Sequence, residues 1–291
     1  MAQESGFFFD FAMSPKQSLG DMTLLHRSTS GAFELYRACK DGSNRVFKAL
    51  KAEPRGNPIY EAMLRKEYQI GYGLEHQSIC RTYSFASIPS VGNCIELEWI
   101  DGRTLGEYLA EKPGRNEVVR VFCDICSALE YIHRRQVIHR DLKPENIMVT
   151  FNGDNVKLLD FGVSDTDSNA VLKAPAGTFD YASPELVSGE EIDLRSDIWS
   201  LGKIMQEYGL YPGIASRCMQ RIPERRYRSA SDVRDAIENR HRRWIWVSVS
   251  IVFIMALLSF FLFSRKGIAD GDYYFDSATE SILNADSRGQ E

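Results

Sequence analysis

Short runs of alternating apolar and polar residues mark the first part of the chain. They cover residues 23–27, 32–39 and 45–51, and Asp41-Gly42 separates the second run from the third. A period of two places alternate side chains on one face of a strand, and Asp-Gly is a strong hairpin-turn signal. The pattern therefore predicts three antiparallel strands.

Helical spacing replaces this alternation in the middle of the chain. Apolar residues recur every three or four positions from Val118 to Ile132, which predicts a helix with one buried face. Cys123 and Cys126 lie three residues apart on that face. Because no second cysteine pair and no nearby histidine accompany them, we interpret both thiols as packing residues and not as zinc or redox ligands.

An uncharged apolar segment runs from Trp244 to Phe263. At a helical rise of about 1.5 Å per residue it would span about 30 Å, the thickness of the hydrocarbon core of a membrane. A buried helix of a globular domain would keep a polar stripe, which this segment lacks. We predict a single transmembrane helix with basic flanks over 240–266, its core at 244–263.

The flanking charges predict how this segment is oriented. A basic run at 240–243 precedes it, whereas Arg265 and Lys266 follow it and give way to a short acidic tail over 267–291. The positive-inside rule favours the cytoplasm for the N-terminal side. We expect a single-pass membrane protein with a cytoplasmic main domain and a tail, either a solvated end or a docking peptide, on the opposite side.

Composition narrows the partners. The chain has 291 residues, of which 44% are hydrophobic and 26% charged, with a net charge of -5. Its lysines and arginines are dispersed and give no basic field, so we expect no nucleic-acid partner. The cysteines lack the spacing of a disulfide framework, which is typical of reduced cytosolic thiols.

Two motifs bring together the residue types that phosphoryl transfer requires. Residues 139–146 read His-Arg-Asp-Leu-Lys-Pro-Glu-Asn, and residues 160–162 read Asp-Phe-Gly. They supply one carboxylate to orient a hydroxyl and two oxygen ligands for magnesium. With every fixed position of both motifs filled, residues 22–239 resemble a Hanks-type serine/threonine protein kinase, similar to bacterial membrane-anchored receptor-like kinases.

The resemblance implies an α+β, two-lobed protein-kinase fold followed by the transmembrane helix. The small lobe, about 22–100, would hold an antiparallel sheet and one helix, and the large lobe, about 101–239, would be mainly helical. Residues 1–21 would be an N-terminal extension. The membrane would be a bacterial inner membrane, or alternatively a eukaryotic internal membrane reached by a tail anchor.

The implied reaction is transfer of the γ-phosphate of ATP, with Mg²⁺ or Mn²⁺, to serine and threonine hydroxyls of proteins. Asp141 would orient the substrate hydroxyl or accept its proton, and Lys143 would contact the γ-phosphate, which makes these two the catalytic residues. Asn146 and Asp160 would bind the metal. The charges of metal and ammonium offset those of the transferring group.

Nucleotide binding would fall mainly to the small lobe. Lys48, in the position of the family's V-A-I-K lysine, would bind the α- and β-phosphates, with Lys51 as the alternative. Glu67 would hold that ammonium by an ion pair. Backbone groups around Glu98 and Ile100 would bind the adenine edge.

The glycine-rich loop departs from the family pattern. Ser28, Ser30 and Phe33 occupy its three glycine positions, and Gly31 lies among them. Glycine permits positive φ and close approach to phosphates, whereas serine or phenylalanine would crowd the turn. We expect either a lowered affinity for ATP or another loop shape where Ser28, Ser30 and Gly31 contact the cofactor.

The resemblance also implies regulation and structural supports. Arg140 is typical of kinases whose activation segment is ordered by a loop phosphate, with candidate acceptors Ser164, Thr166, Ser168 and Thr178. We hypothesise autophosphorylation between self-associating copies in one membrane. Glu185 is expected to pair with Arg226, and Asp197 to bond to the catalytic-loop backbone.

Two other functions compete with an active kinase. A pseudokinase scaffold or nucleotide-binding regulator, with weak or no phosphotransfer, is supported by the altered glycine-rich loop. A small-molecule phosphotransferase of kinase-like fold is disfavoured, because Lys143, Phe161 and residues 177–185 follow the protein-kinase pattern.

Overall fold

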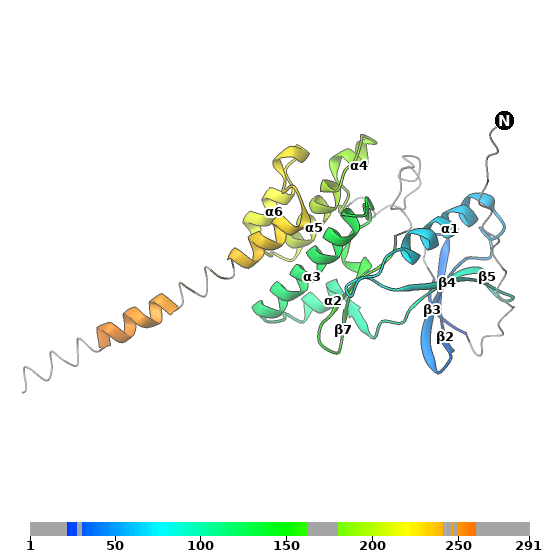
Figure 1. Cartoon of the computed structure of the whole chain (residues 1–291), viewed down its shortest axis with the longest axis horizontal. Helices are drawn as coiled ribbons and strands as arrows, with labels where there is room; N and C mark the ends of the chain where they lie inside the picture. The colour runs from blue at the N-terminus through cyan, green and yellow to red at the C-terminus, as the bar shows by residue number, and fades with distance from the viewer. Residues whose placement is uncertain are drawn as a thin grey trace, which may run out of the picture. The chain divides into compact units, whose positions relative to one another are not determined.

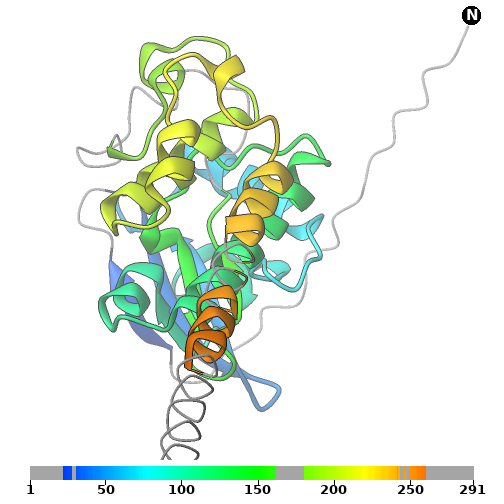
Figure 2. The same cartoon turned by 90° about the vertical axis from the view of Figure 1, so that its left-hand side faces the viewer.

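The computed structural model describes residues 22–27, 31–161, 180–240, 242, 246 and 249–259. The chain divides into two compact units, Met1–Glu238 and Asn239–Glu291. In the first unit, one lobe holds a sheet with a helix and the other is mainly helical, as Figures 1 and 2 show. The predicted two-lobed α+β architecture is therefore confirmed.

The small lobe is built on a five-stranded antiparallel sheet with the strand order β1-β2-β3-β5-β4. The strands are β1 (Thr23–Arg27), β2 (Phe33–Lys40), β3 (Ser43–Leu50), β4 (Thr82–Ile88) and β5 (Gly92–Glu98). Asp41 and Gly42 join β2 to β3 with φ of 51° and 74°. Positive φ at both central residues is the geometry that an Asp-Gly hairpin favours. The three predicted strands are confirmed.

One helix, α1 (Pro58–Tyr72), packs against this sheet. It begins after Asn57, whose side chain accepts a hydrogen bond from the amide of Ile59 at 2.9 Å. Leu64 of α1 forms a buried cluster with Leu50 of β3 and Ile95 of β5. The helix is thus fixed at its start by a cap and along its length by apolar packing.

The large lobe begins after β5. Its helices are α2 (Leu105–Ala110), α3 (Arg115–His133), α4 (Pro184–Ser188), α5 (Arg195–Glu207), α6 (Pro212–Cys218) and a helix over 230–240. A three-stranded sheet is formed by β6 (Gly102–Thr104), β7 (Ile147–Thr150) and β8 (Val156–Leu158). Two 3₁₀ turns, η1 (Pro144–Asn146) and η4 (Pro223–Arg225), complete the described elements.

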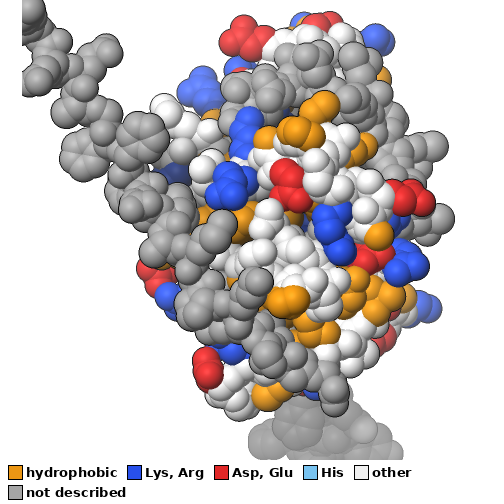
Figure 3. All heavy atoms as spheres, turned by 90° about the vertical axis from the view of Figure 1, so that its right-hand side faces the viewer, with side chains coloured by type: hydrophobic (Ala, Val, Ile, Leu, Met, Phe, Trp, Pro, Cys, Tyr) orange, Lys and Arg blue, Asp and Glu red, His pale blue; other side chains and the backbone are white. Residues whose placement is uncertain are grey.

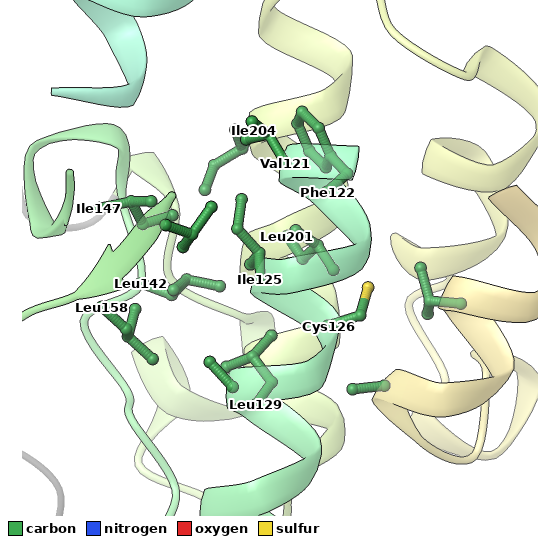
Figure 4. Packing of buried hydrophobic residues seen from close by; sticks show 14 of the residues in the cluster. Val121, Phe122, Ile125, Cys126, Leu129, Leu142, Ile147, Leu158, Leu201 and Ile204 are labelled. Atoms are coloured by element: carbon green, nitrogen blue, oxygen red, sulfur yellow. The ribbon is translucent and has the colours of Figure 1, made fainter. Parts of the chain in front are cut away.

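The core of the large lobe lies around α3, as Figure 4 shows. The predicted helix over 118–132 is confirmed, and its apolar face packs against α5, the β7–β8 sheet and the segment before η1. Cys126 is fully buried in this core, whereas Cys123 is partly buried. The labelled core residues are Val121, Phe122, Ile125, Cys126, Leu129, Leu142, Ile147, Leu158, Leu201 and Ile204.

In the second unit, residues 249–259 are helical and their side chains are exposed. Across the part of the chain that the structure describes, no helix combines the length and the apolar character needed to cross a membrane. Residues 244, 245, 247, 248 and 260–263 of the predicted transmembrane core lie outside the described residues, as does the acidic tail.

On the face that Figure 3 shows, basic and acidic side chains are interleaved. Interleaving weakens the field of either sign, because neighbouring opposite charges offset each other.

Candidate active site

The ammonium of Lys48 is the centre of the site. Lys48 lies on β3 and is 6% exposed. Its Nζ donates to Glu67 Oε1 at 2.7 Å and to Asp160 Oδ1 at 2.9 Å. Three elements far apart in sequence therefore meet at one charge. Lys51, the alternative phosphate ligand, does not make these contacts, so the geometry favours Lys48.

Glu67 reaches this position because α1 lies close to the sheet. Leu64, Glu67 and Gly71 share the buried face of the helix. A Cβ on Gly71 would lie 2.5 Å from Oγ1 of Thr82 on β4, which is too close for any side chain. Glycine at this position therefore permits the approach that aims Glu67 at Lys48.

Burial and neighbouring charges act in opposite directions on the two members of this ion pair. Burial lowers the pKa of Lys48, but the carboxylates of Asp160 and Glu67 outweigh it and raise that pKa. Burial raises the pKa of Glu67 to about 7, although Lys48 opposes the rise. Lys48 is thus a permanent cation, whereas Glu67 titrates near neutrality.

Asp141 is held by its neighbours in the catalytic loop. Lys143 Nζ donates to Asp141 Oδ2 at 2.8 Å, and Asn146 Nδ2 donates to the same oxygen at 2.9 Å. Asn146 also donates to the backbone oxygen of Asp141 at 2.7 Å. The predicted catalytic pair and one predicted metal ligand therefore lie in a single hydrogen-bonded group.

A buried carboxylate supports this loop from beneath. Asp197 of α5 is fully buried, and it accepts hydrogen bonds from the amides of His139 and Arg140, both at 2.9 Å. Its Oδ2 also lies 2.7 Å from His133 Nε2 at the end of α3. Arg140 has a φ of 66°, so the loop turns sharply where Asp197 binds it. The predicted role of Asp197 is confirmed.

Asp160 follows β8, and its carboxylate accepts the hydrogen bond from Lys48. The amide of Leu159 donates to the Asn146 oxygen at 2.9 Å, which ties this segment to the catalytic loop. Asp160 has a φ of 57°, and Phe161 is buried against the ring of His139, with centroids 5.3 Å apart. The left-handed turn thus sends Phe161 into the core and Asp160 toward Lys48.

The donor set fits magnesium bound jointly with phosphates. With both amide hydrogen bonds of Asn146 made through Nδ2, its Oδ1 is the atom left to act as a ligand. Among the described residues no group of three or more His, Cys, Asp or Glu side chains could hold a metal unaided. Mg²⁺ in nucleotide sites commonly relies on one or two protein oxygens plus phosphate. Asn146 and Asp160 match that arrangement.

The segment after β5 carries the residues predicted to bind adenine. The Glu98 side chain pairs with Lys157 at 2.8 Å, and its amide donates to the Arg81 oxygen at 2.9 Å. The Glu98 carbonyl accepts a hydrogen bond from the Cys80 thiol at 3.9 Å. Ile100 is buried two residues further on.

The glycine-rich loop lies only partly within the described residues. Ser28 and Ser30 lie outside them, as do the candidate phosphate acceptors at 164, 166, 168 and 178, while Gly31 lies two residues before the start of β2. Phe33 was predicted only to crowd this loop. The structure places its ring centroid 4.8 Å from Lys48 Nζ. Strand alternation was the available signal for that contact.

A second buried ion pair, between Arg226 and Glu185, stabilises the large lobe. Arg226 donates from Nη1 to Glu185 Oε1 at 2.6 Å and from Nη2 to Oε2 at 2.8 Å. Burial alone would raise the pKa of Glu185, but the hydrogen bond from Arg226, others from the backbone, and those with Ser196 and Ser183 lower it to about 2. The predicted pairing is confirmed.

Lys48, Glu67 and Asp160 form one network between the two lobes. The catalytic loop adds the hydrogen-bonded group of Asp141, Lys143 and Asn146. Together they are the arrangement of a two-lobed kinase. The chain belongs to the protein kinase family, because residues 29–223 match the protein kinase domain.

Known relatives agree with this assignment. A probable serine/threonine-protein kinase of Streptomyces coelicolor is 36% identical over 193 residues, covering 61% of this chain and 28% of the relative. The serine/threonine-protein kinase PknB of Mycobacterium leprae is 31% identical over 204 residues, covering 67% of this chain and 32% of PknB. The chain thus spans about a third or less of the length of these relatives.

The fold also matches solved structures. The kinase domain of PknI from Mycobacterium tuberculosis superposes with a TM-score of 0.59 at 21% identity, covering 78% of this chain and 99% of that domain. The two proteins therefore share the protein-kinase fold.

Proposed function

We propose that this chain is a serine/threonine protein kinase that transfers the γ-phosphate of ATP to hydroxyls of protein substrates. The observation that carries the proposal is the double contact of Lys48 with Glu67 and Asp160, 2.7 Å and 2.9 Å from its Nζ. A cation held in this way can bind phosphates without further rearrangement of the helix that carries Glu67. Homology to serine/threonine kinases supports the choice of acceptor.

The residues divide the work by charge and position. Asp141 accepts hydrogen bonds from Lys143 and Asn146 and so presents a fixed carboxylate to the substrate hydroxyl. Lys143 lies beside it and offsets negative charge on the transferring group. Lys48 orients the phosphates of the nucleotide. A magnesium ion held by Asn146 and Asp160 would neutralise the remaining phosphate charge when bound.

The test compares two lysines that lie three positions apart on and just after β3. Phosphate transfer to a serine peptide should fall by about 10²-fold or more in Lys48→Met, because the phosphates lose their fixed cation. Lys51→Met is the matched control and should keep most of the activity. Equal losses in both variants would contradict the assignment. A folded wild type that binds ATP but transfers nothing would favour the pseudokinase alternative.

We also propose that residues 244–263 anchor the kinase in a membrane. The support is the uncharged apolar sequence of this segment and the exposure of residues 249–259. We further propose that the kinase selects its substrates by co-localisation in the membrane. The support is that only residues 208–211 separate α5 from α6, which leaves no room for a substrate-docking insert. Flotation with liposomes should require residues beyond 242. Flotation of a chain that ends at 242 would contradict the proposal.

Autophosphorylation between neighbouring copies is the regulation we propose. The support is Arg140 next to the catalytic Asp141, together with three hydroxyl residues at 164, 166 and 168. Replacing Ser164, Thr166 and Ser168 with alanine should lower activity toward an added peptide. Full activity of the triple variant would argue against this regulation.

A further inference from the structure

Phe33 lies directly against the ammonium that the proposed kinase would use to bind phosphates. Its ring centroid is 4.8 Å from Lys48 Nζ, within the range of a cation–π contact. Leu35 of β2 stands opposite Lys48 of β3, and Phe33 stands opposite Leu50. Phe33 is therefore the diagonal neighbour of Lys48 on the same face of the sheet.

The ring is held in this place by packing. Phe33 is partly buried and packs against the cluster of Leu50, Leu64 and Ile95 beneath it. Leaving Lys48 would therefore cost these apolar contacts as well as the cation–π contact. The position of the ring is a property of the folded small lobe and not of the neighbouring loop.

The donors of Lys48 show what the ring competes with. An ammonium has three N–H donors, and the carboxylates of Glu67 and Asp160 accept from it. The negative face of the Phe33 ring occupies a further side of the same nitrogen. Nucleotide phosphates that bind Lys48 would approach the ammonium from outside the two carboxylates, and would meet the ring there.

We propose that Phe33 is an affinity-determining residue whose ring competes with nucleotide phosphates for Lys48. The inference rests on the proposed function, in which Lys48 binds the phosphates. A ring face is a weaker partner for an ammonium than a phosphate, so nucleotide at sufficient concentration displaces it. The ring therefore raises the nucleotide concentration needed for occupancy and leaves the base-binding segment after β5 unaffected.

The test measures dissociation constants of the purified full chain for ATP with Mg²⁺, for ADP and for adenosine by calorimetry. Phe33→Ala should tighten binding of both nucleotides by about 3- to 30-fold and leave adenosine unchanged, since adenosine carries no phosphate. Phe33→Tyr keeps the ring face and should stay near the wild type. Phe33→Leu keeps apolar packing without the ring face and should shift in the same direction as Phe33→Ala, which covers a failure of the alanine variant to fold.

Several outcomes would overturn the inference. One is unchanged or weaker ATP binding in both Phe33→Ala and Phe33→Leu. Another is an equal gain in affinity for adenosine, which would mean that the ring acts on the base. The proposed function fails differently: a folded wild type and all folded variants would bind neither ATP nor ADP. If nucleotides bind tightly and their affinity does not change with the residue at position 33, this inference is wrong and the proposed function still stands.

Discussion

Replacing Glu185 with glutamine should destabilise the large lobe strongly. Glu185 and Arg226 are 6% and 2% exposed, and two charge-assisted hydrogen bonds of 2.6 Å and 2.8 Å join them. Arg226 also donates to the backbone oxygens of Gln220 and Arg195 and packs over Trp199. Glu185→Gln leaves this guanidinium in place, buried and without its counter-charge.

The magnitude follows from two independent routes. Breaking one side of a buried ion pair costs about 3–5 kcal/mol. The pKa of Glu185 falls from an ordinary 4.5 to about 2, which corresponds to about 3 kcal/mol of preferential stabilisation of the ionised form. For a domain of this size, about 3–5 kcal/mol lowers the melting temperature by about 6–20 °C.

The sign of the pH dependence is fixed by the same pKa. A depressed folded-state pKa contributes stability that is present above the unfolded value, and that is lost as the pH falls from 4.5 toward about 2. The gap between wild type and Glu185→Gln should therefore be widest near neutrality and narrow below about pH 4.5.

The assay is urea unfolding at several pH values, with thermal melting as the second measurement. Glu191→Gln is the matched control, because Glu191 is exposed six residues further along the chain. That variant should stay within about 0.5 kcal/mol of the wild type. A loss below about 1 kcal/mol in Glu185→Gln, or a gap that does not change with pH, would refute the reasoning.

Three further predictions concern the catalytic machinery and the thiols. Asp197→Asn should lower kcat about 100-fold with a smaller change in KM, because one of the loop amides at 139 and 140 loses its acceptor oxygen and the other loses the carboxylate charge. Steady-state kinetics check this, and an equal rise in KM would contradict it. With a pKa of about 7, Glu67 is ionised and holds Lys48 above neutrality, so kcat/KM should fall as the pH drops through about 7. The pH profile of Glu67→Gln should lack this limb; a variant that kept it would assign the titration elsewhere. Burial raises the pKa of the Cys126 thiol, and it raises the pKa of four other thiols to about 12, those of Cys80, Cys94, Cys123 and Cys218. A thiol reagent at mild pH should therefore label the exposed Cys39 first, and peptide mapping checks this. Rapid labelling of Cys123 or Cys126 would contradict their interpretation as packing residues.

Local patterns predicted most of the fold. The alternation that ends at Lys51 and the Asp41-Gly42 turn predicted the strands, because register and hairpin geometry depend on adjacent residues. The helical period from Val118 to Ile132 predicted the core helix, α3. Motif order also predicted the ion pair of Lys48 with Glu67, which the structure shows although 19 positions separate the two residues.

Contacts that depend on an unusual backbone conformation, or on packing between elements distant in sequence, were not predicted. Asp160 binds Lys48 because a left-handed φ of 57° turns its side chain, and nothing in the order of residues specifies that turn. Phe33 was predicted only to crowd the loop. Its packing on Leu50 and Leu64 was not predicted, because it joins strands and a helix that are distant in sequence. The role of Gly71 was not predicted either, because it depends on the position of Thr82 on a strand that is separate from α1.

The most direct test of the account is transfer of the labelled γ-phosphate of ATP, with Mg²⁺, by the wild type and by Asp141→Asn. This substitution keeps the size of the side chain and removes the negative charge that Lys143 and Asn146 now hold in place. We predict label on serine and threonine of the protein and of an added basic peptide, and a loss of about 10²-fold or more in the variant. Equal incorporation by both proteins, or none by a wild type that binds ATP, would contradict the assignment of Asp141 and of kinase activity.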